Sequence, residues 1–245
     1  MSGSNAGATD AMASEVASIE SIAKAYYGES LLRGRQQTDF LFCVLLLAEW
    51  AFCLVLAMVV TPLTWTGERS AVHLHVYAAV VLGGATALFP LVLYRSQSGT
   101  WLMRHVVAVA QMVFSGLIIH LTHGRIESHF HVFGSLAFLT FYRDWKVLAT
   151  ATLVTAVDHF FRGIFWPVSI YGELPVSDSW LVREEIWRTL EHAGWVIFAD
   201  VFSIVSVQRQ LKELWQASMQ HAKLQLFGEA VQREVVKRTK ELKSK

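Results

Sequence analysis

The sequence predicts an all-α integral membrane protein built as a bundle of six transmembrane helices, and three observations support this. Hydrophobic residues make up 53% of the 245 residues and charged residues 17%, whereas about a quarter of the residues in soluble domains are charged. The mean hydropathy is +0.39. Six apolar runs near the length of a bilayer crossing follow one another, and they leave too little amphipathic surface for a soluble bundle.

The six runs are expected to be the transmembrane helices, and together they form the predicted domain of residues 38–207. They cover residues 38–60, 73–94, 103–121, 129–142, 147–166 and 185–207. The fourth run is short, so it crosses a bilayer only if its helix extends beyond these bounds.

Lysine and arginine residues predict the orientation of the bundle. Eight of them lie close to the span ends on the side of the N-terminus, against five on the opposite side. Because cytoplasmic connections carry such an excess, we expect both termini in the cytoplasm. The net charge of +1 argues against a nucleic-acid partner.

Two further segments flank the bundle. Residues 1–37 are expected to be a cytoplasmic amphipathic segment, which either lies on the membrane surface or leads into the first span. Residues 208–245 contain no proline and a single glycine, and they are expected to continue the sixth span as one long helix. A thin heptad pattern that includes Val231, Val235 and Leu242 predicts a homodimer through this helix, and the alternative is a solvated single helix.

Eight of the ten histidines fall in one layer, at the outer ends of five predicted spans. Imidazole is the commonest metal ligand in proteins, and ionisable groups within a membrane are costly unless they are paired or functional. We therefore expect a metal site in this layer. The alternative for each histidine is a hydrogen bond between helices or a position at the membrane interface. The eight are His73, His75, His120, His123, His129, His131, His159 and His192.

Carboxylates accompany these histidines. Asp158 precedes His159, and Glu127 shares a helix face with His131, so each carboxylate is expected either to bind the metal or to support a ligating imidazole. The expected ligands are His75, His120, His123, His129, His131, His159, His192, Asp158 and Glu127, with His73, Glu191, Arg162 and Asp200 around them.

Geometry on the predicted helices limits some of these roles. His129 and His131 point about 160° apart, so both bind one ion only if the helix is distorted. Arg162 is expected to pair with Asp158 or with a carboxylate of the sixth span. Asp200 and Glu49 lie deeper, where each either continues a proton path, pairs with a polar neighbour or stays protonated.

The number of imidazoles favours two metal ions, because one tetrahedral ion uses four ligands. Dinuclear iron is the first expectation and zinc the second. Copper is less expected, since Cu(I) requires thiolate or thioether ligands. Haem is also less expected, because two facing imidazoles would leave six histidines unexplained.

Residues 120–146, HLTHGRIESHFHVFGSLAFLTFYRDWK, resemble the histidine-rich membrane sensor module that precedes bacterial histidine kinases and related signalling receptors. AVDH at residues 156–159 and LEHAGW at 190–195 fit the same module, and VQREVVKRTKEL at 231–242 resembles the signalling helix behind it. The resemblance implies a sensor in the bacterial inner membrane that passes its signal to a kinase or other transmitter domain. We expect this chain to be the input part of such a receptor, and the alternative is a stand-alone protein.

The expected function is therefore sensing. The metal centre would bind a small ligand such as a diatomic gas, or respond to redox state or to the metal, and the sixth span would carry the change to the C-terminal helix. The first alternative is a membrane di-iron oxidoreductase that acts on a lipid or hydrocarbon, although such enzymes place their histidines at cytoplasmic helix ends. A metal transporter is the second, and only Glu49 and Asp200 suggest a path across the bilayer.

Overall fold

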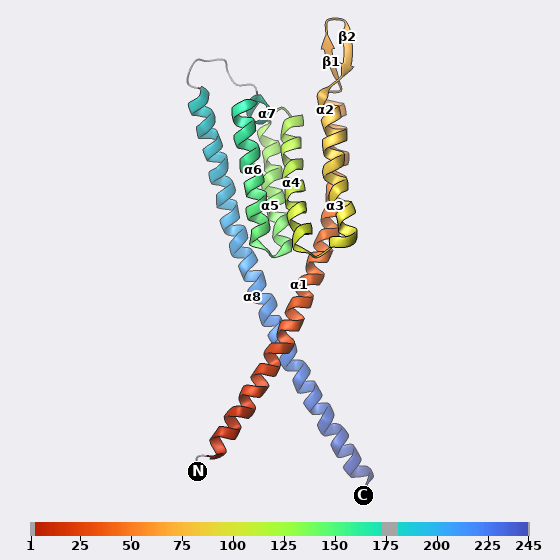
Figure 1. The fold of residues 1–245 in the computed structure, drawn as a ribbon, viewed down its shortest axis with the longest axis vertical. Coiled ribbons are helices and arrows are strands. Elements are labelled where there is room, and N and C mark those ends of the chain that lie inside the picture. The colour runs from red at the N-terminus through yellow and green to blue at the C-terminus, as the bar shows by residue number, and fades with distance from the viewer. Residues whose placement is uncertain (1–2, 173–180, 245) are drawn as a thin grey trace. The chain divides into compact units, whose positions relative to one another are not determined.

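The computed structural model describes residues 3–172 and 181–244, with side chains described at residues 13–172 and 187–244, and it confirms the all-α class (Figure 1). Its α-helices are α1 (Gly3–Val60), α2 (Leu74–Tyr77), α3 (Gly83–Gln97), α4 (Trp101–Leu121), α5 (Ile126–Leu139), α6 (Trp145–Phe165), α7 (Val168–Tyr171) and α8 (Leu181–Lys243). A π-helical turn, Ala78–Leu82, joins α2 to α3, and a 3-10 turn, Thr140–Tyr142, follows α5.

Five helical segments of the described chain are long and apolar enough to cross a membrane. They are Ala13–Val60, Leu74–Gln97, Trp101–Leu121, Trp145–Phe165 and Trp187–Lys243. The fourth predicted span falls on α5, which has 14 residues and is therefore shorter than a full crossing. The sixth falls on α8, although the side chains at its predicted start, residues 185 and 186, lie outside the described ones.

A short β-hairpin, which the sequence did not lead us to expect, connects α1 to α2. Strand β1 (Leu63–Thr66) pairs antiparallel with β2 (Arg69–Val72), and Gly67 at φ +62° occupies the first turn position between them. A glycine there suits a two-residue hairpin turn. All eight strand residues are exposed, so the strands lack the alternation of buried and exposed residues that would have revealed them.

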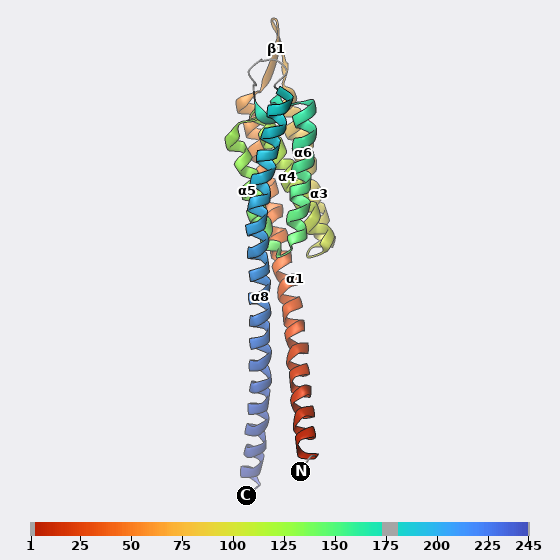
Figure 2. The ribbon, with the colours of Figure 1, turned by 90° about the vertical axis from the view of Figure 1, so that its left-hand side faces the viewer.

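Helix α4 lies at the centre of the bundle, where α3, α5, α6 and α7 pack around it (Figure 1 and Figure 2). Of the positions in its most apolar window, 72% are buried, against 33% in α6 and 11% in α8. Phe114 and Leu121 of α4 form a core with Leu46 and Cys53 of α1. Helix α4 thus provides the scaffold against which the polar side chains of its neighbours are positioned.

A cluster of hydrogen bonds joins α1 to the α3–α4 and α5–α6 connections, at the end of the bundle remote from the hairpin. Asp39 of α1 is fully buried, and its carboxylate accepts hydrogen bonds from the Tyr142 hydroxyl at 2.8 Å and the Gly99 amide at 2.5 Å. The Ser98 hydroxyl adds a third bond at 3.2 Å. This arrangement satisfies a carboxylate that would otherwise be costly to bury.

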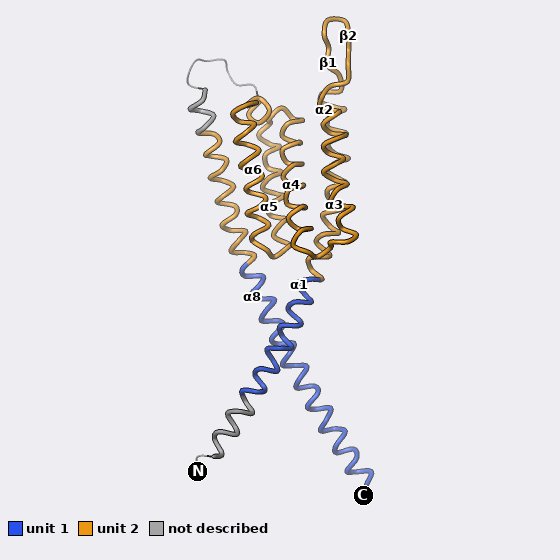
Figure 3. Tube along the Cα trace, in the orientation of Figure 1, with its two compact units in different colours: residues 1–32, 208–245 blue, residues 33–207 orange. Residues whose placement is uncertain are grey.

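The chain divides into two compact units, Arg33–Val207 and the combination of Met1–Leu32 with Gln208–Lys245 (Figure 3). In the second of these, the ring centroid of Tyr26 lies 3.7 Å from that of His221, and Tyr27 meets Trp215 edge-on at 5.7 Å. Helices α1 and α8 each contribute residues to both units without a break. Helix α8 is therefore continuous from the sixth predicted apolar run into the C-terminal segment, as expected.

Replacing Gly124 with alanine should destabilise the bundle. Gly124 has φ +71°, and a Cβ atom there would lie 2.5 Å from backbone atoms of Ile170 and Gly172, which cannot move aside as a flexible side chain would. We expect a loss of about 1–3 kcal/mol from the backbone conformation alone. Thermal unfolding in one detergent measures the effect. The matched control is Gly134→Ala within α5, where the space is open and the change should be neutral or slightly stabilising. Equal melting temperatures for the two variants would contradict this packing.

Candidate functional site

The structure places seven of the eight expected histidines in two groups. His129, His159 and His192 come together from α5, α6 and α8, and are called here the α5–α6–α8 histidines. His73, His75, His120 and His123 meet beside the ends of α2 and α4, and are called the α2–α4 histidines. His131 belongs to neither group and contacts Glu49 instead.

The α5–α6–α8 histidines surround a common point from three helices. The ring centroid of His129 lies 5.1 Å from that of His192 and 5.7 Å from that of His159, and the last two are 6.2 Å apart. His129 and His159 are buried, with 5% and 6% of their surface exposed. His159 follows His129 by 30 residues in the sequence, and His192 follows His159 by 33. The tertiary fold and not local spacing therefore brings these rings together.

All three rings make the same hydrogen bond to the backbone. In each, Nδ1 lies within bonding distance of the carbonyl oxygen four residues earlier on its own helix. The pairs are His129 with Arg125 at 3.1 Å, His159 with Thr155 at 3.1 Å and His192 with Arg188 at 2.8 Å. Because a carbonyl oxygen can only accept, we infer that Nδ1 carries the proton and that Nε2 of each neutral ring has a free lone pair. This is the tautomer in which histidine binds metals through Nε2.

The Nε2 atoms are suited to one shared ligand. Nε2 of His129 is buried and has no hydrogen-bond partner among the described residues. With metal–nitrogen distances of about 2.0–2.1 Å, three imidazoles around one ion have ring centroids roughly 5–5.5 Å apart. The observed separations are near this range, although no three candidate side chains of the described chain stand in the geometry of a bound ion. Closing the site would require a small approach of His159 and His192.

A cavity of about 420 Å³ lies beside these rings, between α5, α6 and α8. All three histidines line it, and its remaining walls are apolar apart from threonine side chains. No aspartate, glutamate, lysine or arginine is part of the lining that the structure describes. A cavity of this kind suits a small neutral molecule better than an ion.

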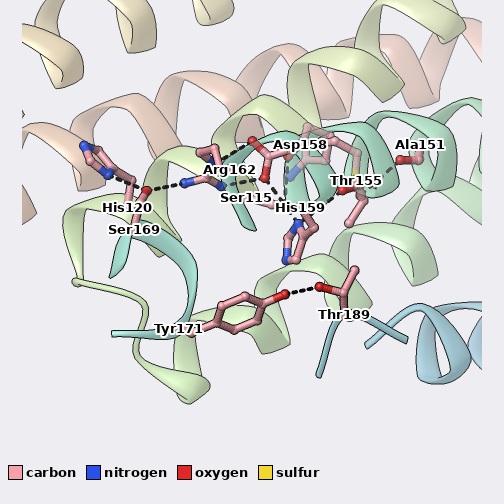
Figure 4. A network of polar contacts seen from close by, with 12 residues as sticks. Ser115, His120, Ala151, Thr155, Asp158, His159, Arg162, Ser169, Tyr171 and Thr189 are labelled. Atoms are coloured by element: carbon pink, nitrogen blue, oxygen red, sulfur yellow. Dashed lines mark hydrogen bonds and ion pairs between the residues drawn. The ribbon is translucent and has the colours of Figure 1, made fainter. Parts of the chain in front are cut away.

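Asp158 lies behind His159, on the Nδ1 side of the ring (Figure 4). Its Oδ2 atom is 3.2 Å from Nδ1 of His159, and both carboxylate oxygens accept bonds from Arg162, at 2.8 and 2.5 Å. Such a two-bonded pair has a fixed geometry. Asp158 therefore occupies the place of a carboxylate that supports a ligating imidazole, and its expected pairing with Arg162 is present.

A polar chain connects this pair to the α2–α4 histidines (Figure 4). Nη1 of Arg162 donates to the hydroxyl oxygen of Ser169 at 2.9 Å, and the same oxygen lies 2.9 Å from Nδ1 of His120. Gly116 makes room for the pair, because a Cβ atom there would lie 3.2 Å from both Asp158 Oδ1 and Arg162 Nη2. Ser169 and Gly116 carry no sequence signal that marks them as part of a site.

The α2–α4 histidines use their Nδ1 atoms differently. Nδ1 of His73 accepts a hydrogen bond from the backbone N–H of His75 at 3.0 Å and so caps α2. The neutral ring of His73 therefore carries its proton on Nε2, the reverse of the α5–α6–α8 histidines. Nδ1 of His75 pairs with the Thr61 hydroxyl at 2.6 Å. The ring centroid of His75 lies 4.7 Å from that of His120 and 5.1 Å from that of His123.

The remaining expected residues have other surroundings, except that Glu191 lines a second cavity together with His129 and His192. Glu127 is exposed and pairs with Arg125 at 3.4 Å, and its pKa is lowered first by a bond from its own backbone N–H and then by that arginine. Glu191 is exposed on α8. Asp200 is buried and accepts a hydrogen bond from Thr152. Glu127 and His131 share α5, but the structure does not bring them to one site.

The comparisons with known proteins add no assignment to this geometry. No protein-family model, no curated protein and no solved structure matches the chain.

Proposed function

We propose that this chain is the membrane-spanning input module of a bacterial signalling receptor, with a transition-metal ion held by His129, His159 and His192 as its sensing element. The observation that carries the proposal is the shared Nδ1 bond of these rings to the backbone carbonyl one turn earlier. It leaves three Nε2 lone pairs, from three different helices, for one ion.

The apolar helices support the membrane location. Within the part of the chain that the structure describes, five of them are long and apolar enough to cross a bilayer. In our proposal α5 and its 3-10 turn complete a six-helix bundle in the bacterial inner membrane, with both termini in the cytoplasm. The exposed apolar side chains of α8, among them Trp195, Phe198 and Phe202, would then face lipid.

Iron is our first choice for the ion and zinc the second, because both accept neutral imidazole ligands. Three protein nitrogens leave at least one coordination position open. The neighbouring apolar cavity gives a neutral diatomic molecule access to that position. We propose one ion at the α5–α6–α8 histidines, since the opposite tautomer of His73 and the separate bonds of His131 distinguish the other histidines from them.

Signal transfer would run through α8. This helix carries His192 and continues without a break to Lys243. Only 11% of its apolar window is buried, so coordination of His192 would be a strong link between α8 and its neighbours α5 and α6. α8 would have two arrangements, one with His192 coordinated and one without. A ligand that binds one of them more tightly shifts the equilibrium toward it, by an amount set by the difference between the two affinities. We further propose that two copies of the protein dimerise through the C-terminal helix, and that this helix passes the signal to a transmitter domain.

A membrane di-iron oxidoreductase is the second candidate. The apolar walls of the cavity beside the three Nε2 atoms favour it, because a hydrocarbon chain could enter there. Turnover of a lipid or hydrocarbon by the purified, iron-loaded protein would establish this function. Ligand-dependent output in a receptor without any turnover would support the sensor.

Substituting any of the three histidines should weaken metal binding. We expect His129→Gln, His159→Gln and His192→Gln to lose about tenfold or more in metal affinity, because each removes a direct nitrogen ligand. Elemental analysis of protein purified without added metal, followed by titration with Fe(II) or Zn(II), measures this. His105→Gln is the control. His105 of α4 pairs with Thr150 of α6, away from the three ligands, so this substitution should leave the metal affinity unchanged. Equal metal content in all four variants would contradict the site.

Metal binding should narrow the distance between α6 and α8. Spin labels at Phe160→Cys and Leu190→Cys report it, since both positions are exposed. The buried Cys43 and Cys53 are replaced by alanine in this background. Pulsed EPR should show a narrower and shorter distance distribution after metal addition, and His192→Gln should abolish the change. A metal-induced change that persists in His192→Gln would show that α8 is not linked through this residue.

A further inference from the structure

A buried polar network lies between α1, α4 and α5, apart from the three proposed metal ligands. Its members are Glu49, Gln111, Ser115, His131 and Ser135. Glu49 is 7% exposed, Gln111 and Ser115 are each 1% exposed and Ser135 is 2% exposed, whereas His131 is half-buried. Such a network is stable only when nearly every donor and acceptor has a partner.

Most of its hydrogen bonds can be assigned directly. The amide nitrogen of Gln111 donates to Oε1 of Glu49, and also to the Ser135 hydroxyl oxygen at 3.1 Å. Nε2 of His131 lies 3.1 Å from the same Oε1 atom. Its Nδ1 atom lies 2.8 Å from the Ser115 hydroxyl and 3.3 Å from that of Ser135. A neutral His131 can donate from Nε2 to Glu49 and accept at Nδ1 from one of the two hydroxyls, because Nδ1 has a single lone pair.

Two atoms remain without a partner among the described residues: Oε2 of Glu49 and the amide oxygen of Gln111. Both are acceptors when Glu49 is ionised, so the network then lacks a donor. An ionised Glu49 would also be a buried charge without a full counter-charge, which is costly within an apolar bundle.

We propose that Glu49, Gln111 and His131 form a proton-binding site, in which the bound proton resides on Oε2 of Glu49. A carboxylic acid and a primary amide pair through two hydrogen bonds, N–H to O in one direction and O–H to O in the other. The first already joins Gln111 to Glu49, and the two unpartnered oxygens are those that the second would join. One proton therefore supplies the missing donor and removes the buried charge.

The site joins three helices, and a cavity gives access to it. Glu49, Gln111 and His131 belong to α1, α4 and α5, so the proton would strengthen the contact of α1 with the centre of the bundle. All three residues line a cavity of about 360 Å³, through which water and protons can reach the carboxyl group. This inference does not rest on the proposed metal site, because none of these three residues is one of its ligands.

Two other arrangements make different predictions. A sodium or potassium ion could bind the two unpartnered oxygens, which would keep Glu49 ionised. An imidazolium form of His131 could pair with an ionised Glu49, but that leaves both oxygens without a donor. Both alternatives require a carboxylate at Glu49, whereas the proposal requires a carboxylic acid.

Infrared spectroscopy of the full chain in lipid vesicles at neutral pH distinguishes them. We expect a carboxylic-acid C=O stretch that shifts in D₂O and is absent in Glu49→Gln, at an intensity of one group per chain. Asp200→Asn is the control and should retain the band, since Asp200 lies in another network with Thr152. If Glu49→Gln does not fold, Gln111→Leu serves in its place and should shift the band of Glu49 to that of an unpaired acid.

The stability of the variants gives a second readout. Glu49→Gln replaces the acid by a neutral group of the same shape and should keep its melting temperature within a few degrees of the parent. An acid band that is the same with and without Glu49 would overturn the proposal. So would a carboxylate band of Glu49. A band that depends on sodium or potassium would identify a cation site, and one that does not would identify an ionised Glu49 beside His131.

Discussion

The hydrogen bond between Nδ1 of a histidine and the carbonyl oxygen one turn earlier decides what the α5–α6–α8 histidines can do. It recurs at His129, His159 and His192, and in each ring it leaves Nε2 as the nitrogen with a free lone pair. The bond also restricts the rotation of each ring, so the nitrogens are positioned before any ligand arrives. The proposed metal binding and the proposed link to α8 both depend on it.

The polar side chains behind these rings make the site part of a larger structure. Asp158 and Arg162 pair against the backbone at Gly116, and Ser169 connects them to His120. An arginine does not give up its proton in proteins. These hydrogen bonds through Arg162 and Ser169 therefore connect the two histidine groups by charge and position and do not form a path for protons. The network of Glu49 is separate from it and connects α1 to α4 and α5.

Much of the fold could be predicted from the sequence. Helices α4 and α6 lie within a few residues of the expected spans, since long apolar runs determine them, and the lack of proline after residue 207 predicted the continuation of α8. The hairpin of β1 and β2 carries no burial pattern. The residue types of the candidate site were also recognisable, but their grouping was not, because it depends on how each helix is rotated in the bundle. His129 and His131 therefore reach different partners, and residues such as Gly116 and Ser169 become visible only in three dimensions.

X-ray absorption spectroscopy of the metal-loaded full chain tests the central claim most directly, because the scattering of imidazole rings counts the histidines around the ion. We expect three imidazole ligands in the parent protein and two when any one of His129, His159 and His192 is replaced. A first shell without imidazole, or one that is unchanged in all three variants, would contradict it.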